Sequence, residues 1–299
     1  MILSIGEILF DIFPGYKRIG GAPFNFAYHS MKMGVPVAFI SKVGDDSAGK
    51  EILEHLDLTG LNSSYVQLDR HHKTGKVIVS LDSDGNPHFD IVKDVAYDFI
   101  EFDQTLTGLL MQKPDLIYIG SLAQRSTRGF KAIQQILSAR DPGTCSFYDV
   151  NLRPGCYTEK IVKSSLMQSD VVKMSQDELK KLKIFYHFSH SDRSFMKYLM
   201  EKNRIEMVSL TKGKAGSELF LNDKTYQMEA KSMGAIADTV GAGDAYAAVV
   251  AMGYLKQWHP NRILAKATEL AGRICTIKGA IPRASDFYDH IVDDEEGTK

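Results

Sequence analysis

The chain contains the stretch Ala237-Asp238-Thr239-Val240-Gly241-Ala242-Gly243-Asp244-Ala245-Tyr246, and a run of small apolar residues follows it. Glycine adopts backbone conformations closed to other residues, so Gly241 and Gly243 allow a turn whose N–H groups face a ligand. Residues 245–252 are apolar almost throughout, which predicts a helix buried on most sides. A helix N-terminus after such a turn attracts anions, because its unpaired N–H groups and its dipole both favour negative charge.

Asp244 is the unexpected residue of this turn, because it brings a negative charge to a site suited to anions. Such a carboxylate is useful if it accepts the proton of a hydroxyl group that attacks a phosphate. Asp is also a common N-cap residue, which explains it without any function. A dinucleotide fingerprint does not fit, since Tyr246 stands at its third glycine position, and the P-loop pattern Gly-x-x-x-x-Gly-Lys-Ser/Thr is missing from the sequence.

The bulk composition limits the class of protein. A chain of 299 residues with 44% hydrophobic content is long enough to bury a large core, as one α/β domain with or without a lid. A net charge of −1 argues against nucleic acid or a membrane surface as a partner. The three cysteines lack metal-ligand spacing, and no apolar run approaches the roughly 20 residues of a membrane span. We therefore expect a cytoplasmic protein that acts on small molecules.

Two N-terminal stretches carry polar groups suited to a ligand with hydroxyl groups. The apolar run at 2–10 predicts a central strand, and Asp11 at its end could accept a hydrogen bond from a hydroxyl, because ligands of open α/β sheets bind beyond strand ends. A lone Asp would more often cap a loop. Gly20 and Gly21 permit close approach of a ligand to the backbone, and a helix is expected directly after them. Asn25 in its first turn can both donate to and accept from a polyol.

The remaining chain combines a hairpin with repeated strand–helix units. Residues 74–98 alternate between apolar and polar around a turn-forming cluster at 82–87, which predicts a β-hairpin that projects from a parallel sheet. From residue 115 onward strands and helices alternate, as in a right-handed parallel sheet. A strand expected at 145–154 carries Asp149, Asn151 and Arg153 at alternate positions, so one face of its end must meet something polar.

Two separate stretches resemble the signatures of one family, the ribokinase-like (PfkB) carbohydrate kinases. The turn at 238–244 resembles the C-terminal signature, and Gly20-Gly21-Ala22-Pro23-Phe24-Asn25-Phe26-Ala27 resembles the N-terminal Gly-Gly-x-x-x-Asn-x-Ala. The form Gly-Gly-Ala-Pro-x-Asn is most similar to the fructokinase branch. The resemblance extends from Ile5 to about Pro282 and implies a three-layer α/β/α fold around a mostly parallel sheet. It also implies a single kinase domain over 1–299, with a small β-sheet lid formed by about 12–20 and 74–98.

The resemblance assigns a role to each signature residue. The transferred phosphate would be bound by the amides of Gly241, Ala242 and Gly243, with Asp244 as the catalytic base and Arg153 near the phosphates. The acceptor sugar would contact Asp11, Gly20, Gly21, Asn25 and Asn151, with Lys42 and Phe89 as additional candidates. The nucleotide would lie against Thr211, Lys212, Gly213 and Gly216, as well as Gly241 and Gly243.

Two metal sites are implied in the same way. Glu178 would organise Mg²⁺ through water molecules, although Ser175 stands where the family usually has Asn, which leaves the role of that position open. Ser175 and Glu178 also fit a capping box, which explains both residues without a metal. Asp238 and the carbonyl of Val240 resemble a monovalent-cation site, for which K⁺ is the expected ion.

The expected activity is ATP-dependent transfer of the γ-phosphate to a sugar hydroxyl, with D-fructose as the first choice of acceptor and fructose 6-phosphate as the product. Ribose, 2-keto-3-deoxygluconate, an inositol derivative or a nucleoside are alternatives, because a few pocket contacts decide between such acceptors. A rival from another class is a catalytically inactive sugar- or nucleotide-binding regulator. The intact Asp244 and glycine turn count against it, since a pure binder needs no base. A homodimer formed through the lid is also expected.

Overall fold

The computed structural model describes residues 1–81, 87–230, 234–282 and 284–292, and within them it contains two sheets. The larger sheet has nine strands in the order β13-β12-β11-β10-β9-β8-β1-β4-β5. In chain order these strands are β1 (Ile2–Ile5), β4 (Val37–Gly44), β5 (Val66–Asp69), β8 (Leu116–Gly120), β9 (Cys145–Asp149), β10 (Val171–Ser175), β11 (Met207–Thr211), β12 (Ser217–Leu221) and β13 (Lys224–Met228). All strand pairs from β5 to β11 are parallel, and β12 and β13 extend the sheet antiparallel.

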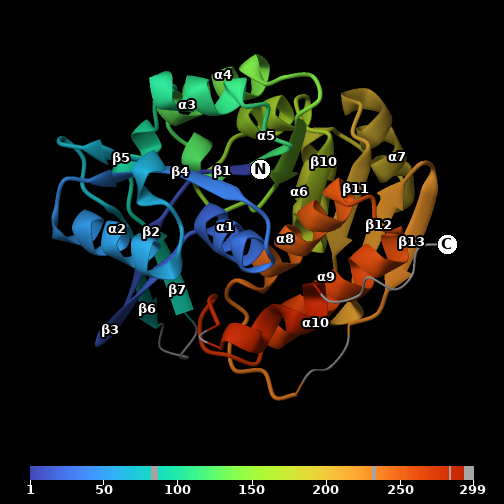
Figure 1. The fold of residues 1–299 in the computed structure, drawn as a ribbon. Coiled ribbons are helices and arrows are strands. Elements are labelled where there is room, and N and C mark those ends of the chain that lie inside the picture. The colour runs from blue at the N-terminus through green and yellow to red at the C-terminus, as the bar shows by residue number, and fades with distance from the viewer. Residues whose placement is uncertain (82–86, 231–233, 283, 293–299) are drawn as a thin grey trace.

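Helices cover both faces of the larger sheet (Figure 1). One face packs against α1 (Ala22–Lys32), α2 (Ser47–Thr59), α8 (Ala242–Leu255), α9 (Pro260–Ile274) and α10 (Asp289–Val292). The other face packs against α3 (Gln104–Met111), α4 (Thr127–Ala139), α5 (Glu159–Leu166), α6 (Gln176–Phe185) and α7 (Asp192–Asn203). The expected three-layer α/β/α architecture is therefore confirmed.

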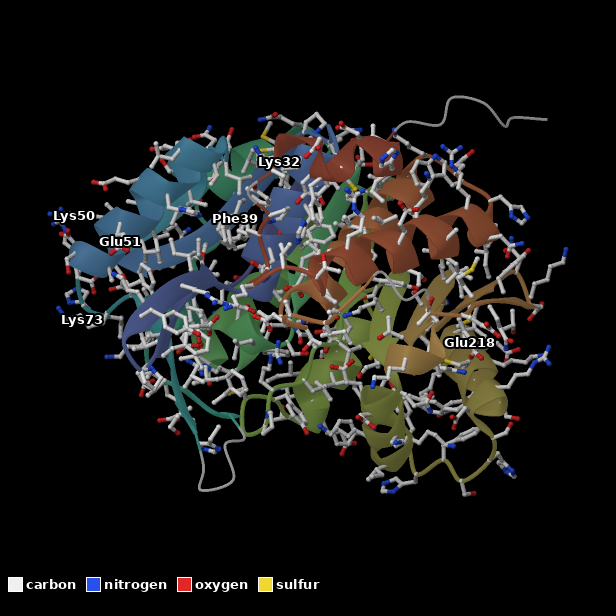
Figure 2. All side chains as sticks on the ribbon, turned by 90° about the horizontal axis from the view of Figure 1, so that it is seen from below. Lys32, Phe39, Lys50, Glu51, Lys73 and Glu218 are labelled. Carbon is white, nitrogen blue, oxygen red and sulfur yellow. The ribbon has the colours of Figure 1, made fainter. Side chains whose placement is uncertain are left out.

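The alternation of side chains along each strand separates the two cores. Tyr118 of β8 packs on the side of α1 and α8, whereas its neighbours Ile117 and Ile119 pack on the side of α4. This is the period of two expected for a strand that is buried on both faces. Phe39 of β4, labelled in Figure 2, lies on the α1 side, with its ring 6.0 Å from that of Phe24.

The smaller sheet has the order β3-β2-β6-β7, formed by β2 (Leu9–Phe13), β3 (Tyr16–Gly20), β6 (Gly75–Leu81) and β7 (Pro87–Ile91). It overlaps the two segments expected to form a lid, so we call it the lid sheet; its closure over a ligand stays a prediction. A third small core, which includes Val77 and Val79 of β6, joins it to the body of the protein. The turn-forming cluster predicted between its last two strands lies, apart from Pro87, outside the described residues.

The prediction of one continuous strand over 2–10 is wrong. β1 ends at Ile5, and the chain leaves the larger sheet through Gly6 before it enters the lid sheet as β2. Gly6 has φ +153°, and a Cβ there would lie 2.4 Å from Cγ of Pro23 at the start of α1. A side chain at this position would be strained and would clash, so the glycine marks the point where the chain passes from one sheet to the other. No helix among the described residues has both the length and the apolar character needed to cross a membrane.

Candidate active site

The predicted anion-binding turn forms the start of α8. Gly241 precedes the helix with φ +80°, a left-handed conformation that favours glycine. A Cβ at Gly241 would also lie 2.3 Å from Cβ of Ala280, so conformation and packing both exclude a side chain. The amides of Gly241 and Gly243 donate to no acceptor within the described residues, whereas the amide of Ala242 is 3.4 Å from the carbonyl of Thr239. Two amides at a helix N-terminus are thus available to an anion.

Asp244 lies one residue further into the helix and is buried. Its Oδ2 accepts a hydrogen bond of 2.7 Å from Nδ2 of Asn25 in the first turn of α1. Burial raises the pKa of the Asp244 carboxyl above its usual range, against the effects of Asn25 and of the charges on Lys173 and Arg153, which lower it. The two predicted signature stretches therefore meet in one site, because α1 and α8 pack side by side (Figure 1).

Lys173 lies beneath the anion-binding turn and is a site residue that the sequence analysis did not single out. It stands on β10 directly opposite Asp149 of β9, and its Nζ is 3.1 Å from both carboxylate oxygens of Asp149. A Cβ at Gly243 would lie 3.2 Å from the same Nζ. The signal was present in the sequence, since a lysine within the apolar run 171–174 needs a charged partner.

The acidic groups around Lys173 stabilise its positive charge, and Lys173 in turn stabilises the negative charge of Asp149. Burial lowers the pKa of Lys173, but the charges of Asp149, Glu178 and Asp244 outweigh burial and raise it overall. Burial raises the pKa of Asp149 to about 6, although Lys173 acts in the opposite direction. Tyr118 also donates a hydrogen bond of 3.2 Å to Oδ2 of Asp149. The site therefore holds a fixed positive charge next to the turn.

The prediction that Asn151 and Arg153 belong to the same strand as Asp149 is wrong. β9 ends at Asp149, and Asn151 follows with φ +35°, so the chain turns instead of alternating. Arg153 lies in the exposed loop beyond, yet its charge lowers the pKa values of Glu7, Asp11 and Asp244. Arg153 is thus close to the acidic groups of the site, by way of a turn and not of a strand.

Asp11, Gly20 and Gly21, three of the residues predicted to bind the acceptor, lie where the lid sheet meets α1. Burial raises the pKa of Asp11 to about 6, with Arg153 and Arg18 acting against it. Gly20 leaves room for Asp11, since a Cβ there would lie 2.6 Å from Oδ2 of Asp11. Gly21 has φ +120°, and a Cβ there would lie 2.4 Å from the backbone carbonyl oxygen of Glu7.

Two further lid-side residues complete this region. Phe89 of β7 pairs with the buried Val79 of β6, so the two side chains lie on the same face of the lid sheet. Asp11 lies on this face too, and we call it the inner face. Phe89 has 51% of its surface exposed. Glu7, which sequence reasoning did not select, is buried, and its Oε2 has no hydrogen-bond partner among the described residues. Burial raises the pKa of Glu7 to about 7, and Asp244 adds to the shift while Arg153 opposes it.

The structure does not bring Lys42 to this group. Its Nζ donates hydrogen bonds of 3.0 Å to the carbonyl of Phe99 and to Oε1 of Glu101, and it lies 3.6 Å from Oδ2 of Asp69. Lys42 shares a face of β4 with Ile40, which belongs to the core on the far side of the sheet from α8. The side chain therefore points away from Asp244.

A cavity of about 530 Å³ opens beside the turn. Its lining includes Thr211, Gly213, Gly216, Thr239, Ala242, Gly243, Thr268, Ala271, Gly272, Cys275 and Thr276. Its volume lies within the usual range of small-molecule sites, and it reaches the helix N-terminus at Gly243. Lys212 is not part of the lining, because its ammonium pairs with Glu218 of β12, labelled in Figure 2.

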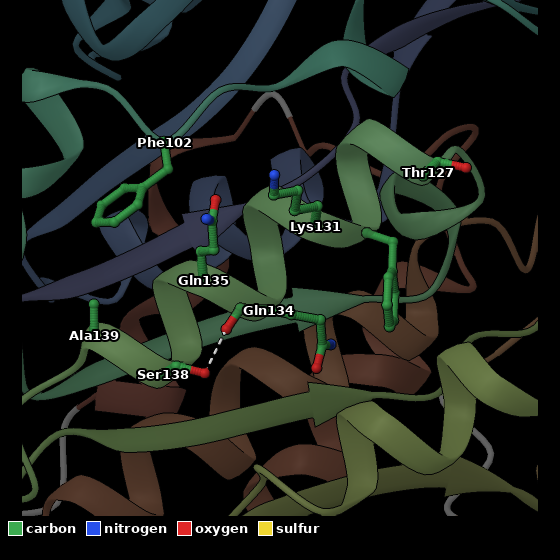
Figure 3. A pocket seen from close by; sticks show the side chains of 8 residues that line it. Phe102, Thr127, Lys131, Gln134, Gln135, Ser138 and Ala139 are labelled. Atoms are coloured by element: carbon green, nitrogen blue, oxygen red, sulfur yellow. Dashed lines mark hydrogen bonds between the residues drawn. The ribbon is translucent and has the colours of Figure 1, made fainter.

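A second hollow, of about 580 Å³, lies on the outer face of α4 (Figure 3). It is lined by Phe102, Thr127, Phe130, Lys131, Gln134, Gln135, Ser138 and Ala139. Helix α4 covers the face of the sheet opposite to α8, so this hollow is separate from the Asp244 site.

The predicted metal residues already have protein partners. Oε1 of Glu178 accepts a hydrogen bond of 2.8 Å from the amide of Leu152, and Oε2 accepts one of 2.7 Å from the amide of Ser175, as the capping box predicts. Asp238 accepts hydrogen bonds from the amides of Val240 and Gly279, each 3.1 Å long. The described part of the chain contains no group of three or more His, Cys, Asp or Glu side chains arranged to hold a metal ion.

Comparison with known proteins places this geometry in a family. The sequence profile of the pfkB family of carbohydrate kinases matches residues 15–286. Similar proteins include a fructokinase of Klebsiella pneumoniae, 29% identical over 94% of both chains, and probable fructokinase-5 of Arabidopsis thaliana, 27% identical over 94% of this chain and 93% of that one.

Solved structures of the same fold are also similar. A PfkB family carbohydrate kinase of Listeria grayi superposes with a TM-score of 0.84 at 22% identity, covering 98% of this chain and 99% of that one. A fructokinase of Xylella fastidiosa with bound ATP superposes with a TM-score of 0.82 at 19% identity, covering 93% of both chains. The chain belongs to the pfkB family of carbohydrate kinases and is a phosphotransferase that acts on a sugar hydroxyl.

Proposed function

We propose that this carbohydrate kinase transfers the γ-phosphate of ATP to the O6 hydroxyl of D-fructose and forms fructose 6-phosphate. The observation that carries the proposal is the hydrogen bond between Asn25 and Asp244, because it joins an acceptor-binding amide to a carboxylate beside free helix amides. The choice of fructose is supported by the relatives that are named fructokinases, at 27% and 29% identity.

In the proposed reaction Asp244 takes the proton of the attacking hydroxyl. Burial raises its pKa above the usual range of a carboxylate, which increases its affinity for that proton. The amides of Gly241 and Gly243 and the charges of Arg153 and Lys173 stabilise the negative charge on the transferring phosphoryl group. Lys173 is held by its buried ion pair with Asp149 and needs little rearrangement during the reaction.

The acceptor is oriented by the residues at the junction of the lid sheet and α1. Asp11 accepts from its hydroxyl groups, the backbone at Gly20 and Gly21 approaches it closely, and Asn25 and Asn151 supply amides. Phe89, on the inner face of the lid sheet, covers the acceptor. Covering matters for this chemistry because water would otherwise compete with the sugar hydroxyl for the phosphate.

ATP would occupy the cavity beside α8, with its adenosine against the part of α9 that lines the cavity and its phosphates at Gly243. Mg²⁺ would neutralise phosphate charge when bound. Glu178 suits water-mediated contact, because each of its oxygens accepts one amide and keeps a second lone pair for a water molecule. K⁺ at Asp238 and the Val240 carbonyl stays a prediction, tested by comparing rates in K⁺ and in tetramethylammonium buffers.

The test is ADP release with MgATP over a panel of fructose, ribose, 2-keto-3-deoxygluconate, an inositol and adenosine. A kcat/KM for fructose well above that for the other acceptors would support the proposal. Preference for another acceptor would keep the proposed chemistry and replace the substrate. If no acceptor of the panel produces ADP release, while calorimetry still detects sugar binding, the result would favour a non-catalytic regulator.

We also infer that two copies of the chain associate through the face of the lid sheet opposite to Asp11, on which Ile78 of β6 is 38% exposed. Sedimentation of the wild type and of Ile78→Lys tests this inference. A monomeric wild type would contradict it.

A further inference from the structure

Arg18 reaches from the lid sheet to the segment that precedes the anion-binding turn. It lies on β3 directly opposite Asp11 of β2. Its Nη1 donates a hydrogen bond of 3.3 Å to Oδ2 of Asp238, a residue 220 positions later in the chain. The two side chains are 32% and 24% exposed, so their attraction is screened less than that of a fully exposed pair.

The guanidinium of Arg18 is held in place by two aromatic rings of its own hairpin. Its Cζ lies 5.0 Å from the ring centre of Tyr16 and 5.6 Å from that of Phe13, and these two rings stack on each other at 4.6 Å. Such contacts restrict the rotamers of a long side chain. Arg18 is therefore directed at Asp238 before any ligand binds.

Asp238 in turn accepts hydrogen bonds from three segments of the site: the one that leads into α8, the one around Gly279, and the lid sheet. Its Oδ1 accepts from the amide of Val240, within the segment that leads to α8, and its Oδ2 accepts from the amide of Gly279. The residue after Gly279 is Ala280, which packs tightly against Gly241. A change in the position of Asp238 would be transmitted to the turn through both contacts, and Arg18 adds the lid sheet to the same carboxylate.

We propose that Arg18 is a positioning residue that couples the lid sheet, and thereby Asp11, to the phosphate-binding turn at Gly241–Gly243. When the ion pair between Arg18 and Asp238 is formed, the acceptor-binding groups of the lid sheet are held next to the phosphate-binding turn. When the ion pair is broken, the lid sheet and the turn move independently of each other. A nucleotide that orders the turn then favours the closed lid, and an acceptor that closes the lid strengthens nucleotide binding by the same factor. The inference rests on the proposed function only for the identity of the acceptor.

Lys17, the neighbour of Arg18 on β3, offers a matched control. It also connects the lid sheet to the body of the protein, through an ion pair with Glu51 of α2 and a position 4.3 Å above the ring of Phe10. Figure 2 shows Glu51 at the outer edge of the molecule, on α2. Lys17→Gln therefore removes the same charge from the same strand without touching Asp238.

The experiment measures hydrogen exchange in peptides covering residues 9–20, with and without the non-hydrolysable ATP analogue AMP-PNP and Mg²⁺. The analogue is expected to slow exchange in the wild type and in Lys17→Gln, and to leave it unchanged in Arg18→Gln at saturating analogue. Persistence of the protection in Arg18→Gln, or its equal loss in Lys17→Gln, would overturn the inference. No sugar is present, so this result is independent of the proposed substrate.

Steady-state kinetics with the best acceptor of the panel provide the second readout. Arg18→Gln is expected to raise the KM for that acceptor about 5- to 20-fold, at the lower end of typical coupling between sites because the pair is partly exposed. Asp238→Asn should raise it similarly, and the double variant no further. Fully multiplicative effects of the two substitutions would show that Arg18 and Asp238 act separately and would refute the coupling.

Discussion

Replacing Lys173 by Met tests whether a buried positive charge supports the turn. The side chain of Lys173 is 8% exposed and that of its partner Asp149 is not exposed at all. Removing one member of a buried ion pair leaves the other charge uncompensated, which typically costs about 3–5 kcal/mol of folding free energy. Tyr118 still donates a hydrogen bond to Asp149 and stabilises part of its charge. We therefore expect a loss of folding free energy at the lower end of this range, about 3 kcal/mol.

Urea unfolding followed by circular dichroism measures this cost. If the loss comes from the stranded carboxylate, Lys173→Met combined with Asp149→Asn should cost at least about 1 kcal/mol less than the sum of the two single substitutions. Lys180→Met is a control on the surface of α6, where Lys180 pairs with the exposed Asp177, and it should leave the unfolding midpoint unchanged. Strict additivity in the double variant would refute the reasoning.

Activity gives a second measure of the same substitution. The Nζ of Lys173 lies close to Gly243, so its charge is well placed to stabilise a phosphoryl group at the turn. Losing one such preorganised group typically lowers kcat about 10²- to 10³-fold. ADP release, measured at a temperature where the variant is folded, should show this loss, whereas a kcat within a factor of two of the wild type would assign Lys173 a purely structural role.

Three further substitutions test the site. Asp244→Asn should lower kcat about 10²- to 10⁴-fold while calorimetry still detects sugar binding, and an unaltered rate would exclude Asp244 as the base. The pKa of Glu7 is raised to about 7 in the folded protein, so the wild type loses folding stability as the pH rises from about 4.5 to 7. Glu7→Gln lacks this titration and should gain stability relative to the wild type over that interval, by up to about 3 kcal/mol. Parallel pH profiles of unfolding for the two proteins would contradict this. Gly241→Ala should lower the folding stability by about 1–3 kcal/mol and weaken nucleotide binding, because of the positive φ and the contact with Ala280. The control Gly108→Ala in α3, where a Cβ meets nothing within 4 Å, should raise the folding stability by up to about 1 kcal/mol. Equal effects of the two substitutions would refute the argument from φ and packing.

The sequence predicted the elements whose cause is local. Glycines at 241 and 243, followed by small apolar residues, were sufficient to predict a turn and a buried helix, and α8 begins at Ala242. Alternating strands and helices after residue 115 were sufficient to predict a parallel sheet, whereas the three-layer architecture was expected from the family resemblance. Hydrophobic periodicity and backbone preference act within a few residues, so they can be recognised without knowledge of the partners.

Errors arose where a distant contact overrides a local pattern. The apolar run at 2–10 indicates one strand, but the approach of Pro23 to Gly6 divides it between two sheets. The alternation from Asp149 to Arg153 indicates a strand that in fact ends at Asp149. Lys42 was a candidate for the acceptor site because of its position in the sequence, and its face of β4 directs it to Glu101 instead.

The sequence by itself determined the chemistry available to this protein: an anion-binding turn, a carboxylate beside it, and an amide in the first turn of another helix. Only the tertiary structure decided which charges meet. Strand pairing sets Lys173 opposite Asp149, and the packing of the lid sheet brings Arg18 to Asp238. The physical reason is that electrostatic interactions depend on distance in space and on burial, and both are properties of the fold and not of position along the chain.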